Sequence, residues 1–182
     1  MTSRGRTALF GLLAAAVAGL DLATKAWAFA RIANERGLEI IRGFFYLRLS
    51  VNYGGVWGVG QGRVWFFVVF SVLAIAFILW MFWTQGRQSG LLAAGLGVLL
   101  GGALGNLYDR VALGHVRDFL DFRFGGWPFP TFNVADVGIN VGVGMLILAA
   151  LLAKPEPNGK QSGGAREGKT GHGPGRSAGG RG

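Results

Sequence analysis

The sequence predicts an all-α membrane protein with four transmembrane helices, a small β-sheet, and an amphipathic loop or helix on the membrane surface. Of its 182 residues 51% are hydrophobic, and the mean hydropathy is +0.41. Four apolar stretches approach the roughly 20 residues that cross a hydrocarbon core: residues 7–30, 64–83, 91–108 and 134–153. Four of the nine acidic residues lie between residues 101 and 140, around the ends of the last two stretches.

Composition narrows the possible functions. The net charge is +9, but much of this excess lies near the two ends of the chain, where anionic lipid is a simpler partner than nucleic acid. Cysteine is absent, which excludes disulfides, thiolate nucleophiles and cysteine-ligated metals. We expect residues 1–154 to form the membrane domain. Residues 155–182 have no apolar segment to bury, so we expect a disordered, basic, glycine-rich tail.

The first apolar stretch has two interpretations. Arg4 and Arg6 precede it and Ala26-Trp27-Ala28 resembles a cleavage site, as in a secretory signal peptide. Asp21 and Lys25 interrupt the approach to that site, which favours a retained helix. Residues four apart share a helix face, so Asp21 and Lys25 are expected to form an internal, structural ion pair.

Residues 47–52 alternate in polarity as a half-buried strand does. Leucine and valine occupy one set of alternate positions (Leu47, Leu49, Val51) and polar residues the other (Arg48, Ser50, Asn52). Together with the apolar residues just before them, they predict a small antiparallel sheet at the bilayer interface. The sequence Asn52-Tyr53-Gly54-Gly55 ends this strand with a turn.

The second and third apolar stretches are predicted to form antiparallel helices joined by the short polar segment 84–90. Aromatic residues at both ends of 64–83 are typical of the two membrane interfaces, and we expect this helix to be a scaffold. In the third stretch Gly97, Gly101 and Gly105 recur every four residues, which favours close helix packing. Three polar residues at its end share one face: Asn106, Asp109 and Arg110.

Residues 111–133 form the predicted amphipathic loop, with Trp127, Phe129 and Phe132 placed against the membrane surface. This segment also carries Asp118. The fourth helix is expected to begin with Asn133 as its N-cap and with Asp136 in its first turn, where a helix favours negative charge. Three residues then line one face of it: Asn133, Asp136 and Asn140.

Counting four antiparallel spans places these polar groups on one side of the membrane. The end of the first helix, the strand, the end of the third helix, the Asp118 segment and the start of the fourth helix all fall there. The other side receives both termini and the short turn 84–90. Arginines occur on both sides, so charge alone leaves the orientation open.

Two carboxyl groups at a membrane face can hydrolyse an amide. If Asp118 and Asp136 lie about 3 Å apart they cannot both ionise, so they share one proton. The ionised group takes a proton from water while the protonated group polarises the peptide bond. Asp121, three residues past Asp118, is expected to be dispensable for this chemistry.

Other chemistries are less compatible with the residues present. Serine catalysis needs a positioned base, and one of the two histidines, His172, lies in the tail. A metal site would depend on His115 and carboxylates alone, so no metal and no cofactor is expected. Two other classes of function remain: a transporter or channel subunit that uses Asp109 and Asp136 as a proton relay, and a non-enzymatic lipid-binding scaffold.

Five motifs follow one another along the chain. They are Asp21-x-x-Thr24-Lys25, Asn52-x-Gly54 with Val56-Trp57-Gly58, Gly101-Gly102-x-x-Gly105-Asn106-x-x-Asp109-Arg110, Val116-x-Asp118-Phe119, and Phe132-Asn133-x-Ala135-Asp136. In this order they resemble the motifs of the lipoprotein signal peptidase (signal peptidase II) family. The members of this family are bacterial membrane aspartic proteases. The resemblance spans nearly the whole chain except the tail. Trp57 stands where a Phe is usual in the family and Gly55 where an Ala is usual.

The resemblance implies a substrate, an orientation and a set of site residues. The substrate would be a prolipoprotein whose cysteine carries diacylglycerol, cut just before that cysteine. The polar face and its sheet would be extracytoplasmic, both termini cytoplasmic, and the protein a multi-pass, monomeric component of the bacterial inner membrane in contact with lipid. Asp118 and Asp136 match the catalytic pair. The substrate-binding or site-supporting residues would be Asn52, Gly54, Asn106, Asp109, Arg110, Asn133 and Asn140.

Overall fold

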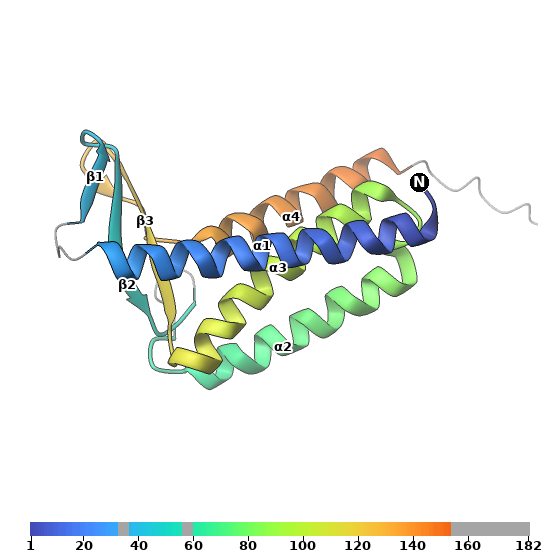
Figure 1. Ribbon diagram of the computed structural model, residues 1–182, viewed down its shortest axis with the longest axis horizontal. Coiled ribbons are helices and arrows are strands. Elements are labelled where there is room, and N and C mark those ends of the chain that lie inside the picture. Colours follow the sequence, from blue (N-terminus) through green and yellow to red (C-terminus); the bar gives the residue numbers. More distant parts are fainter. Residues whose placement is uncertain (33–36, 56–59, 154–182) are drawn as a thin grey trace, which may run out of the picture.

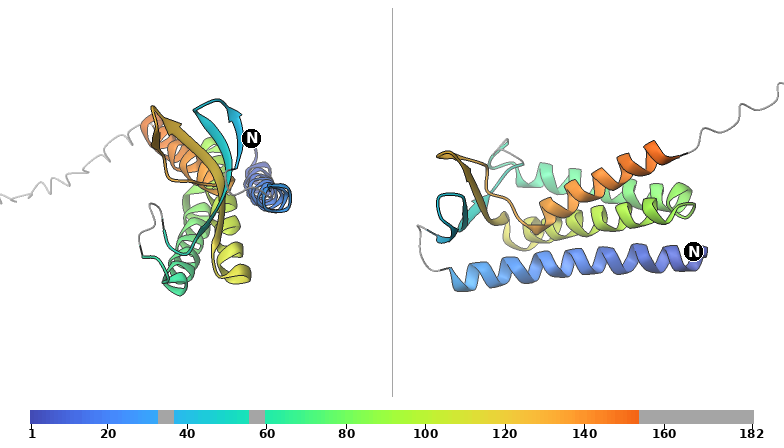
Figure 2. Two further views of the ribbon diagram at one scale, coloured as in Figure 1. Left: turned by 90° about the vertical axis from the view of Figure 1, so that its left-hand side faces the viewer. Right: turned by 90° about the horizontal axis from the view of Figure 1, so that it is seen from above.

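The protein is a bundle of four long helices with a sheet across one end (Figures 1 and 2). The computed structural model describes residues 1–32, 37–55 and 60–153. Within them, four apolar helices are each long enough to cross a membrane: α1 (Ser3–Arg31), α2 (Val64–Met81), α3 (Gly90–Leu113) and α4 (Val134–Leu152). The four helices predicted from hydropathy are therefore present. Trp57 and the 155–182 tail lie outside the described residues.

Helix α3 lies at the centre of the bundle and packs against α1, α2 and α4. Its glycines allow this close approach, as their spacing predicts. A Cβ atom added at Gly97 would lie 2.6 Å from the Phe10 carbonyl oxygen of α1, and one added at Gly101 would lie 2.7 Å from that of Ala14. Helix α2 is apolar on all sides and most of its large side chains are exposed, as lipid contact requires.

Two helix ends differ from the prediction. Helix α2 continues into a π-helical turn, η2 (Phe82–Gly86), before the chain reverses. Helix α3 extends to Leu113, beyond the expected end at residue 108, and stops at Gly114, whose left-handed φ of 74° glycine adopts without strain. Asp109 and Arg110 therefore belong to the last turns of a regular helix, which fixes their directions.

The sheet contains four antiparallel strands in the order β1-β2-β3-β4. They are β1 (Leu38–Ile41), β2 (Phe45–Asn52), β3 (Val116–Phe124) and β4 (Trp127–Pro128). The amphipathic loop or helix expected over 111–133 is therefore wrong for its central part, which forms β3. Backbone groups need hydrogen-bond partners, and β3 satisfies those of β2 along most of its length.

A bulge in β2 changes its predicted pattern. Leu47 pairs with Leu120 and Ser50 pairs with Asp118, so three steps along β2 correspond to two along β3. The strict alternation expected over 47–52 is interrupted there. The bulge places the end of β2, with Asn52, beside Asp118.

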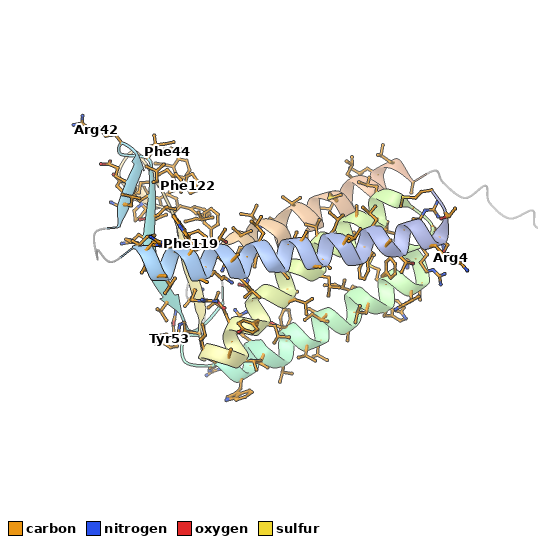
Figure 3. All side chains as sticks on the ribbon, in the orientation of Figure 1. Arg4, Arg42, Phe44, Tyr53, Phe119 and Phe122 are labelled. Atoms are coloured by element: carbon orange, nitrogen blue, oxygen red, sulfur yellow. The ribbon has the colours of Figure 1, made fainter. Side chains whose placement is uncertain are left out.

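A small apolar cluster joins the sheet to the end of α1. Phe119 of β3 is buried with Leu47 of β2 and with Ala28 and Ile32 at the end of α1. Figure 3 shows Phe119 near the end of α1, with Phe44 and Phe122 at the outer part of the sheet. Because Phe119 is held in this cluster, the neighbouring Asp118 has a fixed position over the helix ends.

Candidate active site

Asp118 and Asp136 come from different elements and line the same cavity. Asp118 is the third residue of β3, with only 2% of its surface exposed, and Asp136 lies in the first turn of α4. The cavity has a volume of about 590 Å³. Polar and apolar side chains share its lining, and the polar ones include Asn52, Asn106, Arg110 and Asn140.

Asn133 connects the two carboxyl groups. Its side-chain Nδ2 donates to Asp118 Oδ1 at 2.6 Å. Its Oδ1 accepts from the Asp136 backbone N–H at 3.0 Å, while its own backbone N–H donates to Asp136 Oδ2 at 3.2 Å. The last two bonds form a capping box at the start of α4, where the sequence predicted Asn133 as the N-cap and Asp136 in the first turn. One buried residue therefore both caps the helix and fixes the relative positions of the two carboxyl groups.

The surroundings of Asp118 favour its protonated form. Its pKa is raised from 3.8 to about 7, mainly because burial removes the carboxylate from water and secondly because Asp136 is nearby. Hydrogen bonds from Asn133 and from Asn52 Nδ2, the latter at 3.2 Å, oppose this rise in pKa only in part. Asp118 was expected on a surface loop, but it lies on a buried strand.

Asp136 has donors for both carboxylate oxygens. Asn106 Nδ2 donates to Oδ1 at 2.8 Å, and the backbone N–H of Asn133 donates to Oδ2. The first turn of a helix also presents unpaired N–H groups and the positive end of the helix dipole. Each of these interactions is strongest with an ionised carboxylate.

A fully buried ammonium group, that of Lys25, is linked to Asp136 through Asn106. The ion pair expected between Lys25 and Asp21 is present, with Nζ 2.7 Å from Asp21 Oδ2. Lys25 Nζ also lies 3.4 Å from Asp109 Oδ2 and donates to Asn106 Oδ1 at 2.9 Å. Lys25, Asp21 and Asp109 have no exposed surface, so this network is larger than the simple pair that the sequence suggests.

Two further contacts of this network were not evident in the sequence. Asp21 Oδ1 accepts the backbone N–H of Ala135 at 2.8 Å, which ties α1 to the first turn of α4. Arg117 of β3 donates from Nη2 to Asp109 Oδ1 at 2.7 Å. Asp109 therefore contacts Lys25 and Arg117 and does not line the cavity. The only sequence signal for Arg117 was its place beside Asp118.

Arg110 and Asn140 line the cavity from opposite helices. Arg110 Nη2 donates to the Gly54 carbonyl oxygen at 3.1 Å, which ties the turn after β2 to α3. Asn140 Nδ2 donates to the Asp136 carbonyl oxygen at 2.8 Å, one turn below the carboxyl group. Each of these residues holds backbone at the site and presents a polar group to the cavity.

Asp121 lies apart from the cavity. It is fully buried and pairs with Arg48 at 3.1 Å and with Arg123 at 3.0 Å. Among the described residues, no group of three or more His, Cys, Asp and Glu side chains is arranged to hold a metal ion. His115 instead lies against the ring of Tyr53, with centroids 5.6 Å apart.

These features define a multi-pass membrane protein with two carboxyl groups facing one cavity at the end of its bundle. Residues 13–152 match the family described as signal peptidase (SPase) II, Peptidase_A8. The chain belongs to the signal peptidase II family, and it is therefore a protease.

Several relatives support this assignment. The lipoprotein signal peptidase of Symbiobacterium thermophilum is 41% identical over 143 residues, which cover 79% of this chain and 94% of that protein. The lipoprotein signal peptidase of Bacillus pumilus is 39% identical over 133 residues, covering 73% and 86%. That of Yersinia pseudotuberculosis is 36% identical over 151 residues, covering 80% and 88%.

Two solved structures of bacterial membrane enzymes share the fold. One, determined by the in meso method at 2.3 Å resolution, has a TM-score of 0.71 and 30% identity over 77% of this chain and 85% of its own. The other, at 1.9 Å, has a TM-score of 0.70 and 30% identity over 79% and 92%.

Proposed function

We propose that this protein is an aspartic endopeptidase that removes the signal peptide from diacylglyceryl-modified prolipoproteins, cutting just before the lipidated cysteine. The observation that carries the proposal is the pairing of Asp118 with Asp136 through Asn133 at one cavity. Because the pKa of Asp118 is raised to about 7, a pair with one proton is available near neutral pH.

In the proposed reaction, each carboxyl group has one task. The ionised carboxylate of Asp136 takes a proton from a water molecule, and the oxygen of that water attacks the scissile carbonyl carbon. At the same time Asp118 donates its proton to the carbonyl oxygen. Asp136 then passes its proton to the amide nitrogen and Asp118 recovers one from the tetrahedral intermediate. The C–N bond breaks, giving a new carboxyl group and a free amine, with the pair restored.

The lining of the cavity supports a lipidated substrate. Val137 and Val141 of α4 line it and are 42% and 50% exposed. Phe129 and Phe132 border it from the segment after β3. An acyl chain attached to the substrate could reach this cavity from the lipid phase while the peptide lies against the polar residues, because apolar surface recognises apolar chains.

Localisation and orientation follow from the same proposal. The protein would be a monomer in the bacterial inner membrane, with the site extracytoplasmic and both termini cytoplasmic. Figure 3 shows Arg4 at the end of the bundle opposite the sheet, which suits a cytoplasmic end. Helix α1 would be retained after synthesis, since it supplies Asp21 and Lys25 to the buried network.

The transporter alternative receives no support. Among the described residues, the buried polar and charged side chains all lie at the sheet end of the bundle or in the sheet. A proton relay would need such groups through the depth of the membrane. The matching family and the relatives described above are signal peptidases.

The direct test is cleavage by the purified protein in detergent. A prolipoprotein with a diacylglyceryl cysteine should yield two products, and mass spectrometry should find the lipidated cysteine at the new N-terminus. The same polypeptide without lipid should be cleaved far more slowly. Equal cleavage of both forms, or a cut elsewhere, would refute the proposed specificity.

A further inference from the structure

The position of Lys25 suggests more than structural support. A buried ammonium group has three N–H donors to satisfy, and beside Asp21 and Asp109 the third partner of Lys25 Nζ is Asn106 Oδ1, at 2.9 Å. Asn106 in turn donates from Nδ2 to Asp136 Oδ1 at 2.8 Å. A continuous chain of hydrogen bonds therefore runs from the buried ammonium group to one carboxyl group of the proposed pair.

The ammonium group, together with the Asn133 side chain, determines which way the Asn106 amide points. A side-chain amide has an accepting oxygen on one arm and a donating NH₂ on the other, while an ammonium group can only donate. Lys25 Nζ and Asn133 Nδ2 both donate to Asn106 Oδ1, at 2.9 and 3.1 Å. Turning the amide over would place its NH₂ against two donors, so its N–H must face Asp136.

We propose that Lys25 is a positioning residue for the proposed peptidase reaction: through Asn106 it directs an N–H group at Asp136 Oδ1 and thereby orients that carboxylate for its role as the base. The inference rests on the proposed function of Asp136. Lys25 does not line the cavity, so it acts through Asn106 and does not touch the substrate.

Other charged groups around Asp136 constrain the experiment. They are Asp21 and Lys25 of α1, Asp109 and Arg110 of α3, and Arg117 and Asp118 of β3. Removing the charge of Lys25 alone would leave two buried carboxylates, Asp21 and Asp109, with only Arg117. The test is therefore made in an Asp21→Asn background, which keeps the local charge balanced and retains an oxygen for the Ala135 N–H.

The proposal predicts opposite results for two replacements of Lys25 in that background. Lys25→Met has no donor for Asn106, so kcat should fall roughly tenfold to a hundredfold, as expected for loss of a hydrogen bond to a charged group. KM should stay within about twofold, and the acidic limb of the pH profile should move to higher pH, because the hydrogen bond to the carboxylate of the proposed base is weakened. Lys25→Gln retains an N–H donor and should keep the limb near its wild-type position.

A third substitution separates positioning from stability. Asn106→Leu removes the amide and should displace the acidic limb by itself. If Lys25 acts through Asn106, adding Lys25→Met to Asn106→Leu should produce no further displacement. If Lys25 has only a structural role, replacing it should lower the unfolding temperature without moving the acidic limb of the pH profile. If Lys25 and Asn106 act independently, the shifts caused by the two substitutions should add.

Each outcome decides the matter. Three results would overturn the proposal. The acidic limb of the pH profile could stay at its wild-type position in the Lys25→Met variant, or move equally in the Lys25→Gln and Lys25→Met variants. The shifts caused by Lys25→Met and Asn106→Leu could also add in the double variant. If the Met variant does not fold, the Gln variant decides alone, because a displaced limb there contradicts the role given to the donor. Activity that survives Asp136→Asn would instead show that the proposed function has failed.

Discussion

Replacing Asp118 by Asn should change how protein stability depends on pH. The folded-state pKa of Asp118 is about 7 against an ordinary 3.8, which corresponds to about 4 kcal/mol. A raised pKa means that the folded protein holds the proton more tightly than the unfolded chain does. The wild-type protein therefore has the full contribution below about pH 4 and loses it as pH rises through about 7. An asparagine side chain carries no such proton.

The assay is unfolding in detergent for the wild-type and Asp118→Asn proteins between pH 4 and pH 8. The difference in unfolding free energy should move in favour of the variant by about 4 kcal/mol across this range. The test uses only how the difference in unfolding free energy changes with pH. Its absolute value is not informative, since the Asp118→Asn substitution alters the hydrogen bonds at this position at every pH. A difference that stays constant from pH 4 to pH 8 would refute the pKa and, with it, the protonated state proposed for Asp118.

Three further predictions concern parts of the chain outside the pair. Gly102→Ala should lower the free energy of unfolding by about 1–3 kcal/mol and reduce cleavage, because the added Cβ atom would press on the Ala135 carbonyl oxygen beside Asp136. The control for thermal unfolding is Gly11→Ala, since Gly11 has open space around it. Asp121→Asn should lower the unfolding temperature, because it breaks a buried ion pair, while activity per folded molecule stays near wild type. Deleting residues 159–182 should leave detergent activity unchanged at equal protein concentration, and a loss would contradict our view of the tail.

Much of the architecture was available from local sequence. Four apolar stretches predicted the four helices, and counting spans brought the polar groups to one end. The Asn133 cap and the place of Asp136 in the first turn followed from capping chemistry, which depends on residues three apart. The glycine spacing of α3 also predicted close packing, because small residues four positions apart let a partner helix approach closely.

The parts that sequence reasoning missed depend on long-range pairing. Strand β3 alternates in polarity only from Leu120 to Phe124, and its aromatic residues also suit a membrane-surface loop, so only pairing with β2 decides between them. The contact of Asp21 with Ala135 joins residues 114 positions apart, and no local pattern predicts it. The burial of Asp121 between two arginines depends on the same sheet, and no local pattern predicted it.

The central claim is that Asp118 and Asp136 together catalyse cleavage, and a single set of variants tests it. Turnover of a diacylglyceryl prolipoprotein should be measured for Asp118→Asn, Asp136→Asn and the control Glu39→Gln, an exposed residue of β1 whose hydrogen bonds to Gly43 and Tyr46 need only an acceptor. Both aspartate variants should fold and lose activity by about a thousandfold or more, while the control stays near wild type. Retention of more than roughly a tenth of wild-type turnover by either aspartate variant would contradict the paired mechanism.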